Sequence, residues 1–363
     1  MASSILNTPF RLLPSSRTLK TEVSYHAQPP RRTPRNRLQP PRHHPLPSPV
    51  PSRRSLGLLP RPLTVINGTL GPNPHGVLVF GGTHGNEYEG QIAVKRLCQD
   101  LDPASLHGRV ILMPQLSESA CRANQRVSPF DHVNMNRAFP GSPHGTLSSR
   151  IAHFVSSQIF PLGRVVIDVH SGGREGAFPL CTSFHPIPDP AQAAEIETVA
   201  RLFDTPFLFI YASTMGSGLL TDHAEALGKI SIGGEFGSGE TADPIGIRHA
   251  YKGIRNVLRH YQLLSEPVQP IRPPGAPPPR LVSATELSAY VPCPRDGVWE
   301  PLVDLGAPVA AGDLLGRLHD FSDHAEKSLE IHAQRSGYLL MTHRSARPLK
   351  GQTLYVIAEE TTL

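Results

Sequence analysis

The sequence has few cysteines and no long apolar segment, and both absences narrow the class of protein. Only four cysteines occur among 363 residues, without C-x-x-C spacing, so we expect structural thiols in a reducing compartment rather than a disulfide framework. No apolar run is long enough to span a bilayer, and the first residues lack the apolar core of a secretory signal. We therefore expect a cytoplasmic protein without a membrane partner.

Acidic residues are scarce at one end of the chain only. The first 62 residues hold ten Arg, one Lys and a single acid, so the remainder carries about −5 of the whole-chain net charge of +5. This proline-rich stretch is predicted to be a disordered extension. Residues 1–20 are rich in serine and free of acids, so organelle targeting stays open. Because the rest of the chain is mildly acidic, we expect no nucleic-acid partner.

Strand and helix patterns alternate through the middle of the chain. The expected strands are residues 63–70, 77–80, 109–116, 165–170, 207–211 and 230–236. The expected helices are residues 87–99, 148–159, 191–203, 219–227 and 247–264. Such alternation predicts an α/β fold with a mixed, mainly parallel sheet flanked by helices. Residues 117–145 show no periodicity, and a loop of that length inside a compact domain is usually functional.

The pattern changes after a proline-rich segment that predicts an extended linker. Short β runs separated by glycine and proline follow at residues 297–302, 307–318, 337–341 and 353–358. We therefore expect four parts: a disordered extension (1–62), an α/β domain (63–267), a linker (268–280) and a small, barrel-like all-β domain (281–363). The motifs of the α/β domain indicate its chemistry.

A predicted strand-to-helix turn carries two candidate metal ligands. In VLVFGGTHGNEYEG, residues 77–90, an apolar strand stops at two glycines, and His84 and Glu87 follow. Histidine and glutamate three residues apart can converge on one zinc ion, with a third ligand supplied from far along the chain. Taken alone, H-x-x-E is more often a strand-end histidine followed by a glutamate that suits the helix dipole.

Two later strand ends carry matching polar residues. Side chains alternate along a strand, so Asp168 and His170 point to the same side. His170 stands at the carboxyl end of its strand, where open α/β sheets bind ligands, and is a candidate third metal ligand that Asp168 could orient. Glu235, flanked by glycines, is a candidate general base for a water activated by the metal. A polar strand end and a surface turn are the structural alternatives.

Arginines in the long loop suggest recognition of an anion. Arg126 lies upstream of the segment Asn134-Met135-Asn136-Arg137. Guanidinium groups match carboxylates in bidentate fashion, so one arginine could hold an anionic substrate group and another could polarise a scissile carbonyl. Structural salt bridges are the alternative for both.

Taken together, these motifs resemble the succinylglutamate desuccinylase/aspartoacylase family, a branch of the zinc carboxypeptidase fold. The segments that carry the resemblance are H-G-N-E at 84–87, N-x-N-R at 134–137, D-x-H at 168–170 and E-F-G at 235–237. It spans about residues 63–264, and the C-terminal β domain is also typical. Within the family, GGTHGNEYEG, NMNRAFPG and VVIDVHSGG look most like the bacterial N-acetyl-diaminobutyrate deacetylases of ectoine breakdown.

The resemblance implies that residues 63–267 form a zinc hydrolase catalytic domain with a metal centre and a group that carries a proton. His84, Glu87 and His170 would hold one zinc ion per chain, with an open position for water. Glu235 would take the water's proton and pass it to the leaving amine. Asp168 would support the centre from behind His170.

The resemblance also implies how the substrate is held. Arg126 would stabilise the oxyanion, although the gap to Arg137 is longer than in aspartoacylase-like members, so Arg122 is an alternative. Asn136 and Arg137 would clamp the substrate's α-carboxylate. Asn86 stands where close relatives often carry Asp, which leaves the precise substrate open.

We therefore expect a zinc-dependent amide hydrolase that removes a short acyl group, acetyl by resemblance, from a small amino acid such as N-acetyl-2,4-diaminobutyrate. The alternatives are a deacylase of another N-acyl amino acid, a metallocarboxypeptidase, and a non-catalytic binding protein with a vestigial metal site. The expected partner is this small-molecule substrate, and homo-oligomerisation stays open. We expect the wall that reads the substrate side chain within residues 171–185 and 213–218.

Overall fold

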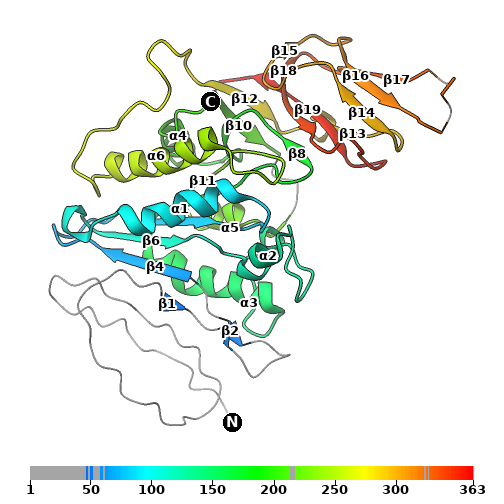
Figure 1. Cartoon of the computed structure of the whole chain (residues 1–363). Helices are drawn as coiled ribbons and strands as arrows, with labels where there is room; N and C mark the ends of the chain where they lie inside the picture. The colour runs from blue at the N-terminus through cyan, green and yellow to red at the C-terminus, as the bar shows by residue number, and fades with distance from the viewer. Residues whose placement is uncertain are drawn as a thin grey trace.

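The computed structural model describes residues 46–47, 50–51, 58–59, 62–212, 217–322, 324–325 and 327–362. In this part of the chain, helices cover both faces of one long sheet, and a smaller antiparallel sheet lies near its end (Figure 1). The expected α/β fold with a mainly parallel sheet is confirmed for the central strands. The predicted extension falls almost entirely outside the described residues. No helix within them is both long and apolar enough to cross a membrane.

The central strands run in the order β4-β6-β5-β7-β11-β9-β10. Their bounds are β4 Pro62–Asn67, β5 Val77–Gly81, β6 Arg109–Met113, β7 Val165–Val169, β9 Cys181–Phe184, β10 Phe207–Tyr211 and β11 Ile230–Glu235. Strands β6, β5, β7 and β11 are parallel, whereas β9 is antiparallel to β11. Because β5, β7 and β11 are parallel neighbours, their carboxyl ends meet at one edge, where His84, His170 and Glu235 follow or end them.

Two hydrophobic cores lie on opposite faces of the sheet. Val77 and Val79 of β5 pack in a core with helices α1, α4 and α6, while Leu78 and Phe80 pack in another with α3 and α5. The helices are α1 Tyr88–Asp100, α2 Glu118–Ala123, α3 Leu147–Phe154, α4 Pro190–Arg201, α5 Leu220–Ala226 and α6 Pro244–His260. Burial on both faces explains why the central strands are almost wholly apolar.

The long sheet continues past the proline-rich segment. β12 (Arg280–Ala284) pairs in parallel with β10, and β19 (Thr353–Glu360) pairs antiparallel with β12. The other strands here are β13 Tyr290–Pro292, β14 Val298–Pro301, β15 Pro308–Val309, β16 Leu314–His319, β17 Leu329–His332 and β18 Gly337–His343. Strands β14, β16 and β17 form the smaller sheet, whose core includes Trp299. The four-part division stays a prediction.

Several elements differ from the sequence expectations. The loop at 117–145 contains α2 and a 3-10 turn at Met135–Arg137, both too short to show a periodic pattern. The expected helix at 148–159 is α-helical only to Phe154 and continues as a π-helical turn, Val155–Ile159. Strands β9 and β12 were not expected, because β9 has only four residues and β12 begins at the end of the proline-rich segment.

Candidate metal centre and active site

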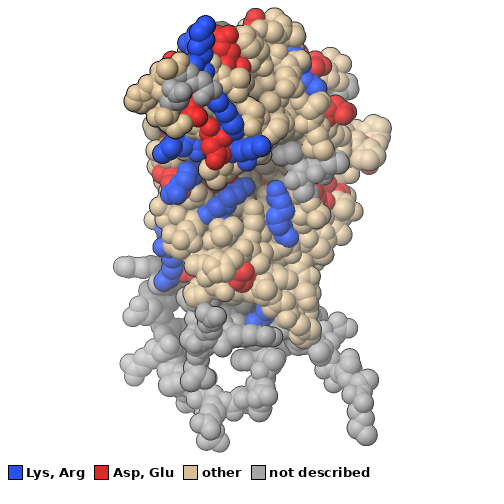
Figure 2. Space-filling model, turned by 90° about the vertical axis from the view of Figure 1, so that its right-hand side faces the viewer, with Lys and Arg blue, Asp and Glu red and all other residues tan. Residues whose placement is uncertain are grey.

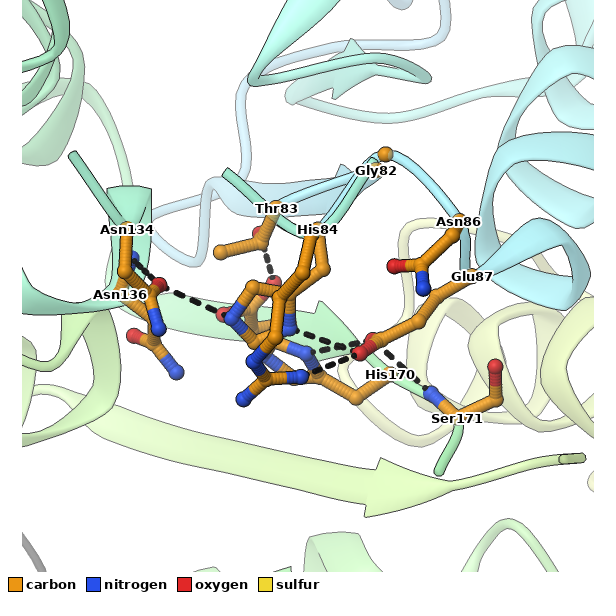
Figure 3. A network of polar contacts seen from close by, with 12 residues as sticks. Gly82, Thr83, His84, Asn86, Glu87, Asn134, Asn136, His170 and Ser171 are labelled. Carbon is orange, nitrogen blue, oxygen red and sulfur yellow. Dashed lines mark hydrogen bonds and ion pairs between the residues drawn. The ribbon is translucent and has the colours of Figure 1, made fainter. Parts of the chain in front are cut away.

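The turn between β5 and α1 presents His84 and Glu87 (Figure 3). Gly82 has a φ of +63°, in the left-handed region that favours glycine. A Cβ on Gly85 would lie 2.0 Å from the backbone carbon of Ala120 in α2. Only glycine therefore allows this turn to pack against α2, and that packing fixes the directions of the two ligand side chains.

His170 reaches the same point from the end of β7. Nδ1 of His84 lies 2.8 Å from Oε1 of Glu87, and Nδ1 of His170 lies 3.0 Å from Oε2 of the same carboxylate. The backbone N–H of Ser171 also donates to Oε2, at 3.1 Å. One ligand atom from each of the three side chains lies within 4.8 Å of the others. The structure thus brings together the three residues expected to bind zinc.

The outer ring nitrogens of both histidines face oxygen acceptors. Nε2 of His84 lies 3.0 Å from Oδ1 of Asn134, and Nε2 of His170 lies 2.8 Å from Oδ2 of Asp168. Oδ1 of Asn134 also accepts a backbone N–H, which identifies it as the oxygen of that amide. These acceptors favour a proton on Nε2 of each ring, so that each Nδ1 directs a lone pair at Glu87.

Two lone pairs and a carboxylate repel one another unless positive charge lies between them. Burial lowers the pKa of His84, so a proton on its Nδ1 is disfavoured. Burial also acts to lower the pKa of His170, but the charges of Asp168 and Glu87 and the hydrogen bonds to them together raise that pKa well above the usual value. Without a metal, a proton on His170 would therefore supply the positive charge. Two histidines and one carboxylate are the donor set of catalytic zinc sites. The residues present therefore fit a zinc ion.

Asp168 is positioned to hold His170 in place. Its carboxylate is fully buried and accepts a hydrogen bond from Oγ1 of Thr83 at 2.6 Å as well as facing His170. A ligand histidine whose second nitrogen donates to a carboxylate is fixed in both tautomer and orientation. Thr83 and His84 are adjacent, so one turn supplies both a ligand and a support for the opposite ligand.

Glu235 ends β11 beside His170. The N–H of Phe236 donates to the carbonyl oxygen of His170 at 2.9 Å, and the N–H of His170 donates to that of Gly234 at 3.1 Å. Oε2 of Glu235 is buried without a hydrogen-bond partner among the described residues. Burial, together with the charge of Glu87, raises the pKa of Glu235 to about 8. A carboxyl group with such a pKa can accept and release a proton near neutral pH.

Arg126 reaches this centre, whereas Arg122 does not. Nη1 of Arg126 donates to Oε1 of Glu87 at 3.1 Å, and its side chain lines the cavity described below. Arg122 pairs with Glu118 on its own helix, α2, and its side chain is 74% exposed. Of the two candidates for polarising a carbonyl, only Arg126 is therefore placed to contact a bound group.

Asn136 and Arg137 line the same cavity from the 3-10 turn. Nη1 of Arg137 donates to the carbonyl oxygen of Asn136 at 2.6 Å, and Oδ1 of Asn136 accepts from the N–H of Leu220 at 2.9 Å. Burial lowers the pKa of Arg137, and the charge of Arg126 lowers it further. Two guanidinium groups that repel each other are stabilised by an anion between them.

The cavity has a volume of about 300 Å³ and is lined by residues from His84 to Val356. Its polar part is lined by the candidate ligands, Glu235 and the candidate substrate-binding residues. Its apolar part is formed by Phe178, Phe209, Tyr290, Met341 and Val356. The C-terminal contributions were missed from the sequence, because apolar residues in strands look like core. Of the wall expected at 171–185 and 213–218, the first segment supplies Glu175, Phe178 and Ser183, and residues 213–216 lie outside the described part.

Figure 2 shows the side of the molecule on which α2 and β8 (Gly176–Ala177) lie in Figure 1. Lys and Arg side chains gather midway up this face, and acidic side chains accompany several of them. A local excess of positive charge raises the concentration of small anions near a surface. This distribution agrees with the two arginines inside the cavity.

The comparisons with known proteins include all the candidate site residues. A family model for the succinylglutamate desuccinylase/aspartoacylase catalytic domain matches residues 74–261. The N-alpha-acetyl-L-2,4-diaminobutyric acid deacetylase of Halomonas elongata is 33% identical over 299 residues, which cover 82% of this chain and 85% of that protein.

Solved structures agree with the sequence comparisons. The succinylglutamate desuccinylase/aspartoacylase from Rhodobacter sphaeroides has a TM-score of 0.83 and 31% identity, covering 88% of this chain and 96% of that one. The product-bound ectoine utilization protein EutE (DoeB) from Ruegeria pomeroyi has a TM-score of 0.80 and 30% identity. The match covers 86% of this chain and 92% of that one. The expected resemblance is thereby confirmed: this chain belongs to the succinylglutamate desuccinylase/aspartoacylase family, a family of deacylases.

Proposed function

We propose that this protein is a zinc-dependent amide hydrolase that removes an acetyl group from the nitrogen of a small amino acid, with N-acetyl-2,4-diaminobutyrate as the first candidate substrate. The observation that carries the proposal is the convergence of His84, Glu87 and His170 beside the buried carboxyl of Glu235. One zinc ion per chain would be held by the first three residues.

A zinc ion bound there would act as a Lewis acid on the scissile carbonyl and on water. Glu235 would accept a proton from the attacking water and donate it to the leaving amine. Its carboxyl ionises more readily once positive charge offsets Glu87, which otherwise raises its pKa. Asp168 would keep His170 in the orientation that the reaction requires.

Arg126 and Arg137 would contact different parts of the substrate. Arg126, 3.1 Å from Glu87, would stabilise the negative charge that develops on the carbonyl oxygen. Asn136 and Arg137 would hold the substrate's α-carboxylate on the far side of the reacting bond. Such anchoring places the amide in reach of Glu235 and so lowers the entropic part of the barrier.

The finer substrate rests on similarity and on the size of the cavity. A volume of about 300 Å³ suits a small N-acyl amino acid better than a peptide. The Halomonas elongata relative acts, by its name, on the acetylated diamino acid. Glu175 lines the cavity with a carboxylate outside the proposed metal and proton-transfer set, and could face the free ammonium group of such a substrate.

A panel of acetyl, succinyl and aspartyl amides, together with ordinary dipeptides, tests this proposal. Acetylated diaminobutyrate should give the highest kcat/KM. Succinyl or aspartyl preference would favour a deacylase of another N-acyl amino acid, and comparable turnover of dipeptides would favour a metallocarboxypeptidase. Inactivity on the whole panel with zinc present would favour a binding protein. The cytoplasmic location and homo-oligomerisation stay predictions.

A further inference from the structure

A second cluster of ionisable residues, one buried and two partly buried, lies behind the cavity. Nδ1 of His185 is 2.8 Å from Oε2 of Glu225, and its Nε2 is 2.9 Å from Oδ1 of Asp222. The side chain of His185 is 3% exposed and that of Glu225 is 8% exposed. His185 directly follows β9, and both carboxylates belong to α5. This cluster, His185–Asp222–Glu225, therefore ties a helix to the sheet.

The cluster has the composition of a metal site, and one ligand atom from each residue lies within 4.8 Å of the others, as at His84, Glu87 and His170. Each ring nitrogen of His185 has one carboxylate within hydrogen-bonding distance. The two carboxylates thus face different edges of the ring, Asp222 at Nε2 and Glu225 at Nδ1. An imidazolium that donates to Glu225 and forms an ion pair with Asp222 accounts for both contacts without a metal.

The helix held by this cluster supports the predicted carboxylate clamp. The N–H of Leu220, the first residue of α5, donates to Oδ1 of Asn136 at 2.9 Å. Just before the helix, the carbonyl oxygen of Gly218 accepts from the N–H of Phe139 at 3.1 Å. A Cβ on Gly218, whose φ is +85°, would lie 2.6 Å from the carbonyl oxygen of Arg137. The start of α5 is therefore packed directly on the turn that carries Asn136 and Arg137.

The same cluster also backs the cavity wall. The ring of Tyr211 lies 4.0 Å from that of His185 between centroids, and its hydroxyl is 3.4 Å from Oγ1 of Thr221. Both Tyr211 and Thr221 line the cavity, whereas His185 does not. The charge of Asp222 acts on Arg137 and favours its protonated form against burial. His185 thus lies directly behind Tyr211 and does not itself line the cavity.

We propose that His185 is a positioning residue for substrate recognition: by bridging Asp222 and Glu225 it fixes α5, and through α5 it fixes the turn on which Asn136 and Arg137 receive the substrate's carboxylate. The inference rests on the proposed function, because it assumes that this turn binds a carboxylate. His185 itself does not touch the substrate. Its loss should therefore weaken binding of the carboxylate more than it slows the reaction at the amide.

The experiment compares an N-acetyl amino acid with its α-carboxamide, which keeps the scissile bond and removes the charge. His185→Phe keeps a ring against Tyr211 but removes the hydrogen bond to Glu225 and the ion pair with Asp222. Asp222→Asn keeps the size of that side chain while removing its charge. We expect KM for the carboxylate substrate to rise about tenfold or more, as for loss of a hydrogen bond to a charged group, with kcat changed much less. Kinetics on the carboxamide should stay unchanged, and His185→Gln should restore part of the preference.

Matched measurements separate positioning from general damage. His319→Phe removes a similar histidine–glutamate pair, 2.9 Å from Glu300 on β14, and should leave both substrates unaffected. The proposal would be overturned by equal losses of kcat/KM on both substrates, by a fall in kcat alone, or by no change. If His185→Phe does not fold, the same measurements on Asp222→Asn decide. A second zinc equivalent that vanishes with His185→Phe would also overturn it.

Failure of the proposed function gives a different result. If the wild-type zinc protein hydrolyses neither substrate, the deacylase proposal fails, and calorimetric binding of 2,4-diaminobutyrate and its carboxamide then tests His185. We expect a preference for the carboxylate that Asp222→Asn reduces about tenfold. Equal affinities in the wild-type protein would overturn the inference.

Discussion

The backbones of His170 and Glu235 are bridged in parallel across the ends of β7 and β11. Hydrogen bonds of 2.9 and 3.1 Å hold the bridge on both sides. A candidate metal ligand and the candidate base therefore cannot move independently, although they come from separate strands. Their relative position is set by the sheet rather than by a loop, which suits a reaction that depends on sub-ångström alignment.

Replacing Glu235 by Gln should abolish most activity without releasing the metal. The amide keeps the size of the side chain but cannot accept the water's proton, so we expect kcat to fall by about 10²- to 10⁴-fold. Zinc content measured by atomic emission should stay near one per chain. Full activity in this variant would contradict the proposed mechanism.

Removal of zinc should inactivate the protein and lower its thermal stability. A ligand that binds only the folded state raises the free energy of unfolding with the logarithm of its concentration, so added zinc should raise Tm in the metal-free protein. His84→Ala, which removes one ligand, should show neither the Tm rise nor recovery of activity. A metal-free protein that hydrolyses its substrate at the full rate would exclude the metal proposal.

Arg126→Ala and Arg122→Ala form a matched pair. Arg126 contacts Glu87 and lines the cavity, so its loss should reduce kcat by about 10²-fold or more, as for other donors to an oxyanion. Arg122 is a surface residue paired with Glu118, and its loss should change kcat by less than about twofold. A larger fall in kcat for Arg122→Ala than for Arg126→Ala would instead assign the contact with the oxyanion to Arg122.

Glu175→Gln should change substrate preference selectively. If Glu175 faces a substrate ammonium, KM for N-acetyl-2,4-diaminobutyrate should rise, while KM for N-acetyl-2-aminobutyrate, which lacks the amine, should stay the same. The expected rise is about five- to tenfold, because the side chain is solvent-exposed and its charge is screened. Equal changes for both substrates would show that Glu175 does not read that charge.

The His185 cluster predicts a pH dependence of stability. Burial alone would lower the pKa of His185, but its hydrogen bonds to Asp222 and Glu225 raise it from 6.5 to about 9. A raised pKa in the folded state stabilises the fold fully below about pH 6.5, and this contribution is lost as pH rises through about 9. The difference corresponds to on the order of 3 kcal/mol.

Urea unfolding of the wild-type protein and of His185→Phe between pH 6 and 10 measures this contribution. The stability difference between the two should be largest near pH 6 and should shrink toward pH 10. His319→Phe serves as the control, because its histidine pair is partly exposed. A difference that stays constant across this range would show that His185 is not held as an imidazolium.

Residue patterns indicated the candidate ligands more completely than the residues around them. His84, Glu87 and His170 each follow or begin a recognisable strand or helix, so parallel pairing of β5 and β7 was enough to bring them together. Short elements escaped prediction, because four residues such as Cys181–Phe184 contain too few alternations to mark a strand.

The cluster behind the cavity could not have been found from the sequence. His185 and Glu225 are 40 residues apart and belong to no motif. Their contact depends on how α5 docks on the sheet, which local propensity does not determine. The apolar wall at Met341 and Val356 was hidden for a related reason, since pairing of β12 with β10 is what carries the C-terminal strands to the cavity.

The pairing of β12 with β10 has a consequence for when the protein becomes able to bind and turn over a substrate. Val356, a wall residue, belongs to β19 (Thr353–Glu360), which comes after the candidate ligands and Glu235 in the chain. The ribosome therefore delivers this part of the wall after them. A nascent chain would thus carry the candidate ligands and base before its binding cavity is closed, so turnover should begin only once β19 has paired with β12.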